Sequence, residues 1–183
     1  MKIAGIDYSL TSPSVCVFDS TEWSVDKCKL HYITKKDKFI EQTDLVHGYL
    51  YPAYRNDTER YCNLAEWTTK ILIDAGVTHA YIEGYAYNAV GRVFQIAENG
   101  GLLKTFLWKN DIEYGVFAPA EIKKFATGKG NSNKEKMYDS FLEETSINLF
   151  AKINQEERKN WNPVSDMVDA YYIAKLGFDR SSV

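Results

Sequence analysis

The opening stretch of the chain, residues 2–10, is almost entirely apolar but carries one acid, Asp7, near its end. Apolar and polar residues alternate again over residues 14–18. With Pro13 between them, the two stretches predict a hairpin whose first strand is central in a sheet. A buried carboxylate is costly unless it is paired, hydrogen-bonded or bound to a metal. Asp7 is therefore predicted to end a core strand where it needs counter-charge, the alternative being a carboxylate that caps the following turn.

The rest of the chain alternates between strand and helix periods. The pattern predicts a strand over residues 28–34, a helix over 58–75 closed by Gly76, a strand over 79–83, a helix over 90–108, a strand over 114–117, a helical turn from Pro119 through Phe125, a helix over 134–149, and a last helix from Pro163 to Gly177. Residues 35–56 have no clear period. This order predicts an α/β fold in which helices flank a mixed five-stranded sheet with antiparallel first strands.

Length and composition predict one domain, residues 1–183, because 183 residues with 45% hydrophobic composition suffice for a single core. Three cysteines without paired spacing, Cys16, Cys28 and Cys62, favour reduced thiols in the cytoplasm over a disulfide framework or a zinc site. No apolar run approaches the ~20 residues of a membrane span, so we expect a soluble protein with no membrane partner. The net charge of −3 gives no overall attraction to nucleic acid.

Four acids lie at the ends of predicted elements: Asp7 and Glu83 finish apolar strands, and Asp166 and Asp169 lie in the first turns of the last helix. They would converge if the two strands were neighbours and the helix packed across them. Oxygen ligands without histidine or cysteine favour Mg²⁺ or Mn²⁺. Two such ions in one site would activate water and stabilise the leaving oxygen of a phosphodiester. For Asp166 alone, a favourable interaction with the helix dipole is the alternative.

A local basic patch follows the fifth strand. Between Ala120 and Lys136, five lysines against two acids give a balance of +3. They are Lys123, Lys124, Lys129, Lys134 and Lys136. Such a patch is typical of proteins that contact the phosphates of nucleic acid. The alternative is that these lysines form an ordinary solvent-exposed surface.

Together these segments resemble the RuvC-type Holliday junction resolvases. The resemblance rests on Gly5-Ile6-Asp7, Ile82-Glu83, a Lys-Lys pair followed by Gly-Lys-Gly-x-x-x-Lys within residues 119–134, and the Asp-x-x-Asp pattern of residues 165–170, in that order. It implies a ribonuclease H-like fold and a homodimer that makes paired metal-dependent nicks in four-way DNA junctions during recombination and repair. It assigns the catalytic and metal-binding roles to the same four acids, Asp7, Glu83, Asp166 and Asp169.

The resemblance also implies an aromatic wedge at the junction centre, for which Tyr85 and Tyr87 are candidates, with a place in the core equally open to each. Tyr8-Ser9 stands where bacterial members usually have Pro-Gly, which fits a divergent member such as a phage-encoded one acting in the host cytoplasm. The predicted helix over residues 90–108, with Phe94, Phe106 and Trp108 as apolar anchors, is the expected self-association surface.

Three alternatives stay open. The first is another ribonuclease H-like nuclease that acts on branched DNA or RNA. The second is a nucleotide-binding domain of the actin type, whose opening strand also carries Gly-x-Asp, but which usually has a second glycine-rich loop and a longer chain. The third is a DNA-binding module without activity, against which four acids in place argue.

Overall fold

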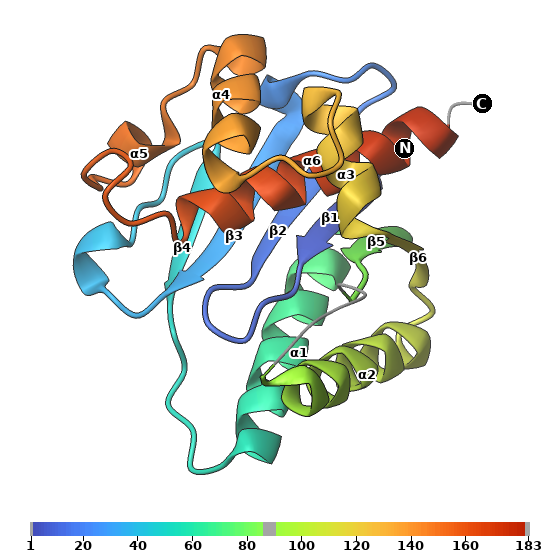
Figure 1. Cartoon of the computed structure of the whole chain (residues 1–183). Coiled ribbons are helices and arrows are strands. Elements are labelled where there is room, and N and C mark those ends of the chain that lie inside the picture. Colours follow the sequence, from blue (N-terminus) through green and yellow to red (C-terminus); the bar gives the residue numbers. More distant parts are fainter. Residues whose placement is uncertain (1, 86–90, 182–183) are drawn as a thin grey trace.

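The computed structural model describes residues 2–85 and 91–181 (Figure 1). The described residues form one six-stranded sheet in the order β4-β3-β2-β1-β5-β6. The strands are β1 (Lys2–Asp7), β2 (Ser14–Asp19), β3 (Cys28–Thr34), β4 (Val46–Leu50), β5 (His79–Glu83) and β6 (Glu113–Phe117). The helices are α1 (Asp57–Ala75), α2 (Val93–Lys109), α3 (Pro119–Thr127), α4 (Lys134–Thr145), α5 (Leu149–Lys152) and α6 (Val164–Ser181), with short 3-10 turns η1 (Val25–Lys27) and η2 (Asp37–Phe39).

Strand pairing places two of the predicted acids side by side. The strands β1, β2 and β3 pair antiparallel, as predicted. The strand β5 pairs parallel with β1, with Ile6 opposite Ile82, so Asp7 and Glu83 end adjacent strands at one edge of the sheet. The carboxyl ends of parallel strands are the usual position of a site in an α/β sheet.

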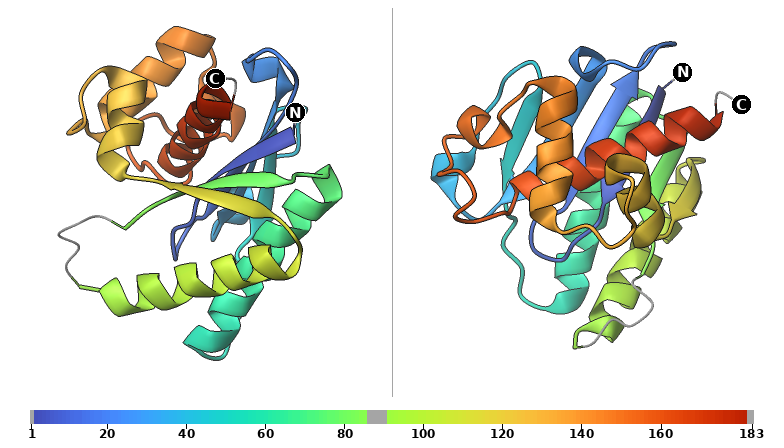
Figure 2. Two further views of the ribbon diagram at one scale, coloured as in Figure 1. Left: turned by 90° about the vertical axis from the view of Figure 1, so that its right-hand side faces the viewer. Right: turned by 45° about the horizontal axis from the view of Figure 1, so that its top comes forward.

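Two layers of helices cover the two faces of the sheet, as Figure 2 shows from the side. Alternation along β1 divides its side chains between them: Ile3 packs with α6, whereas Ala4 and Ile6 pack with residues of α1 and α2. Since successive residues of a strand point to opposite faces, Asp7 shares the α6 face with Ile3 and Gly5.

The helix α6 lies unusually close to the sheet because glycines form the contact. A Cβ atom on Gly5 of β1 would fall 2.2 Å from the backbone nitrogen of Ala174 in α6. A Cβ atom on Gly177 of α6 would fall 2.2 Å from the ring of Tyr81 in β5. The prediction that the last helix stops at Gly177 was therefore wrong: this glycine lies inside the helix, where it makes room for a tyrosine.

The sheet has one strand more than the five predicted. The additional strand, β4, lies in residues 35–56 and pairs parallel with β3. Its sequence, Val-His-Gly-Tyr-Leu, contains a glycine and a histidine that weaken the strand pattern. Its Gly48 lies against the hydroxyl of Tyr32, so the glycine meets a packing requirement of the neighbouring strand.

The helix predicted over 134–149 is interrupted. Its first part ends at Thr145, and Ser146 adopts a left-handed conformation with φ 57 before α5 begins at Leu149. By contrast α1 agrees with the sequence, since Asn56 caps its N-terminus and Gly76, with φ 70, closes it. Within the described ranges, no helix combines the length and apolar character that membrane crossing requires.

Candidate active site

The four acids come together where β1, β5 and the first turns of α6 meet. Strand pairing fixes Asp7 beside Glu83, and packing of α6 on β1 brings Asp166 and Asp169 above them. Their charges act on one another: Asp166 and Asp169 both raise the pKa of Asp7, and Glu83 raises that of Asp169. The convergence inferred from the ends of the elements is therefore present in the fold.

Asp7 and Asp169 are the two acids whose pKa the site raises most. Burial is the main cause of the raised pKa of Asp7, and burial with the charge of Glu83 raises the pKa of Asp169 to about 8. Among the described residues, no side chain donates a hydrogen bond to either carboxylate. Desolvated carboxylates close together disfavour ionisation, which is the condition that a bound cation would relieve.

Asp166 has a different environment, because polar side chains surround it. Its carboxylate accepts hydrogen bonds from Ser12, from Ser9 at 3.4 Å, from Asn162 Nδ2 at 2.9 Å and from Ser165 Oγ at 3.0 Å. We call these four donors the Asp166 cradle. Burial raises the pKa of Asp166, and the hydrogen bond from Ser12 is the largest effect that opposes the rise.

Two lysines of the predicted basic patch lie beside the acids. Lys134, the first residue of α4, donates to Asn162 Oδ1 and to Ser165 Oγ, both at 3.1 Å, and thereby supports the Asp166 cradle. Its charge lowers the pKa of Asp7 and of Asp169, while the charge of Lys123 lowers that of Glu83. Both lysines therefore offset the negative charge of the site.

The other residues predicted to contact DNA do not form part of the cluster of acids and lysines. Lys124, Lys129 and Lys136 are exposed on α3, α4 and the loop between them. Tyr85 follows β5, and its side chain lies against α2, where its hydroxyl donates to the carbonyl oxygen of Ala97 at 3.4 Å. It is neither core nor in contact with the acids. Tyr87 lies outside the described residues.

The donor chemistry of the site suits a hard divalent cation, because four carboxylates converge without histidine or cysteine. Asp7, Glu83 and Asp169, which accept no side-chain hydrogen bond among the described residues, are the carboxylates with free ligand capacity. Among the described residues, no three side chains of histidine, cysteine, aspartate or glutamate already close on one point as a formed metal site would. The fit is thus one of chemistry and charge.

Sequence reasoning did not find the Asp166 cradle. Ser9, Ser12, Asn162 and Ser165 are common residue types. Ser9 and Ser12 are 157 and 154 residues away from Asp166 in the sequence, and Asn162 is 4 residues away. The one available signal was the polar turn that follows Asp7, where the pattern Ser-Leu-Thr-Ser interrupts an apolar hairpin.

No family profile matches the chain, and no curated protein sequence matches it either. Solved structures do match. Thermus thermophilus RuvC in complex with a Holliday junction has 16% identity and a TM-score of 0.64, covering 95% of this chain and 90% of that one. The chain has the fold of the RuvC-type resolvases.

Two further resolvases share this fold along nearly all of the chain. The yeast mitochondrial Holliday junction resolvase Ydc2 has 13% identity and a TM-score of 0.59, covering 98% of this chain and 78% of that one. The fowlpox virus resolvase, in complex with junction DNA, has 14% identity and a TM-score of 0.52, covering 99% of each chain. The resolvase fold predicted from the four motifs is therefore confirmed, with one strand more than expected.

Proposed function

We propose that the protein is a metal-dependent endonuclease that resolves four-way DNA junctions by paired nicks, with residues 1–183 acting as one nuclease domain. The observation that carries the proposal is the meeting of Asp7, Glu83, Asp166 and Asp169 at one edge of a resolvase-type sheet. Solved structures with this fold include two resolvases bound to junction DNA. Repair and recombination of DNA are the processes that such an activity would serve.

Each side chain of the site has a distinct task in this proposal. Asp7, Glu83 and Asp169, with Asp166, would hold Mg²⁺, for which Mn²⁺ can substitute. When bound, two such ions supply an activated water and charge stabilisation at the leaving oxygen. The cradle orients Asp166 and opposes the rise in its pKa that burial causes. Lys134 and Lys123 reduce the repulsion between the acids and an approaching phosphodiester.

The test is cleavage of a synthetic four-way junction, a linear duplex and an RNA/DNA hybrid, each with and without Mg²⁺. We expect symmetric nicks in the junction alone and only with the metal. Asp7→Asn should bind the junction but not cut it, and Asp7→Asn/Asp169→Asn should lose no more activity than either single variant, because the acids act as one unit.

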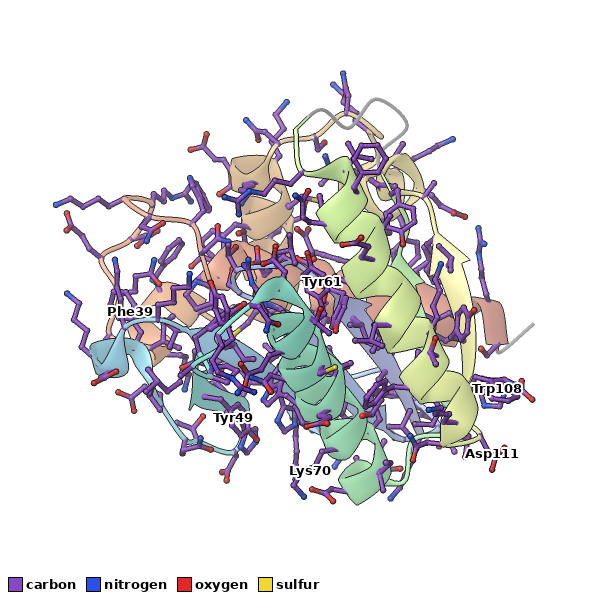
Figure 3. All side chains as sticks on the ribbon, turned by 90° about the horizontal axis from the view of Figure 1, so that it is seen from below. Phe39, Tyr49, Tyr61, Lys70, Trp108 and Asp111 are labelled. Atoms are coloured by element: carbon purple, nitrogen blue, oxygen red, sulfur yellow. The ribbon has the colours of Figure 1, made fainter. Side chains whose placement is uncertain are left out.

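Asp111→Asn is the matched control, because it removes the same charge from an exposed turn (Figure 3) at a position whose left-handed φ of 54 asparagine tolerates. It should cut like the wild type. Cleavage by Asp7→Asn would refute the assignment of the acids. Cleavage of the hybrid in place of the junction would favour the alternative of a ribonuclease H-like enzyme with another substrate.

Paired nicks need two sites, and we propose that a second copy of the chain supplies the other one. A four-way junction in its open form has two-fold symmetry, which two identical chains match. The helix α2 offers an apolar surface for this contact, since Phe94 is 81% exposed and Trp108, which is labelled in Figure 3, is 75% exposed. Val116 and Tyr114 of the neighbouring strand β6 are also exposed and extend this surface.

A further inference from the structure

A pocket of about 220 Å³ lies beside the acids, between the β1–β2 turn, the end of β3 and the segment that leads into α6. Ser12 lines it from the turn and Asn162 from the segment before α6. Thr34, Lys35 and Lys36 line it from the end of β3, and Phe39 of η2 contributes an aromatic wall. Three of its ten lining residues, Lys35, Lys36 and Phe39, come from the region of the chain for which the sequence predicted no element.

The lining combines an apolar part, formed by Ile33, Phe39 and Pro163, with polar and cationic side chains. Hydroxyl and amide groups offer hydrogen bonds, and no acidic residue is among the lining residues. Lys35 and Lys36 are exposed, and among the described residues neither forms an ion pair with a carboxylate. Their ammonium groups lie over the rings of Tyr51 and Phe39, at 4.9 and 5.3 Å. Two unneutralised cations among the lining residues favour an anionic ligand.

The pocket and the acids share residues. Ser12 and Asn162, which line the pocket, both donate hydrogen bonds to Asp166, and Asn162 Nδ2 also donates to Ser12 Oγ at 2.7 Å. A ligand in the pocket is thus separated from Asp166 by one layer of donors, which screens the two negative charges from each other. Because β3 runs in the same direction as β1, its end and the pocket lie at the same edge of the sheet as Asp7.

We propose that this pocket binds the phosphate and adjoining deoxyribose of one nucleotide next to the scissile position. The proposal rests on the proposed action on DNA, which it deepens by naming where the strand is held. A volume of 220 Å³ is below the 300 to 1,000 Å³ typical of pockets for larger ligands, so it suits a phosphate and its sugar. The pocket lysines, Lys35 and Lys36, together with Lys123 and Lys134, place cations on both sides of the acids.

The first experiment compares two double variants with the same change in charge. Lys35→Gln/Lys36→Gln removes the cations at the pocket, and Lys70→Gln/Lys109→Gln removes two exposed cations from α1 and α2, of which Lys70 is marked in Figure 3. We expect the pocket variant alone to bind the junction more weakly, with a slope of log K against log salt that is lower by about 0.7 to 0.9 for one lost phosphate. Equal behaviour of the two variants overturns the proposal.

The second experiment does not depend on cleavage. A short single-stranded oligodeoxynucleotide is titrated into the ¹⁵N-labelled wild-type protein without Mg²⁺. We expect shifts of the backbone amides of Ser12, Thr34 and Lys36 and of the side-chain amide of Asn162, and their loss in the pocket variant. Shifts confined to residues 123–136 overturn the pocket, whether or not the protein cuts junctions. Pocket shifts in a protein that cuts no junction would refute the proposed function and keep the binding site.

Discussion

Replacing Gly5 by alanine would place a methyl group inside the backbone of α6. The new Cβ would lie 2.2 Å from the nitrogen of Ala174 and 2.3 Å from the carbonyl oxygen of Ala170, whereas ordinary contacts begin at 3.4 Å. Both atoms belong to the helix backbone, so no side chain can turn away, and α6 must move from β1 by about 1 Å. Overpacking of this kind costs about 1 to 3 kcal/mol of unfolding free energy.

The same displacement moves Asp166 and Asp169 away from Asp7. A misplacement of about 1 Å in an active site can lower the rate about 10²-fold. Urea unfolding measures the first effect, and single-turnover cleavage of a junction under conditions where the variant is folded measures the second. Gly101→Ala is the control, because nothing lies within 4 Å of that Cβ and alanine favours the helix. If Gly5→Ala had the stability and the cleavage rate of the wild type, the close approach of α6 to β1 would not be what positions Asp166 and Asp169 relative to Asp7.

Three further outcomes are expected. Lys129→Ala should lower the salt slope of junction binding by about 0.9, whereas an unchanged slope would place the DNA surface elsewhere. Phe94→Glu should halve the mass found by sedimentation, and a wild type that is monomeric on the junction would exclude the dimer. Burial lowers the pKa of His31 to about 3, helped by the charges of His47 and Lys29. The folded state then stays neutral while the unfolded state takes up a proton below about pH 6.5, so stability is lost as the pH falls from there toward 3. Urea unfolding of His31→Phe should show a shallower loss between pH 7 and 5, and the same slope as the wild type would contradict this.

The sequence predicted the fold where the pattern is local. The hairpin, the strand over 28–34 and the helix closed by Gly76 follow from periodicity and caps within a few residues. The sequence pattern did not predict the strand β4, because its pairing with β3 is non-local and its Gly48 makes room for the ring of Tyr32. The sequence did not predict the break at Ser146, because serine seldom adopts a left-handed conformation and therefore does not indicate the end of a helix.

The four acids could be predicted from the sequence, but the residues that surround them could not. An acid at the end of an apolar strand or on an apolar helix face stands out, so Asp7, Glu83 and Asp169 could be found one by one. The donors to Asp166 have no such contrast with their neighbours, and only the packing of α6 on the β1–β2 turn assembles them. Which lysines face the acids was equally a matter of packing, since Lys123 and Lys134 lie on different helices.

The β1–β2 turn, residues 8–13, is held from both faces of the sheet. From the α6 side, Ser9 and Ser12 bond to Asp166. From the other side, the buried Arg60 of α1 donates to the carbonyl of Leu10, and Tyr51 donates to the same oxygen at 2.7 Å. The conformational entropy of this turn is therefore lost when the chain folds. In the proposed complex, a DNA strand that contacts Ser12 would have no loop to order, so more of the contact free energy would remain for affinity and for alignment of the strand.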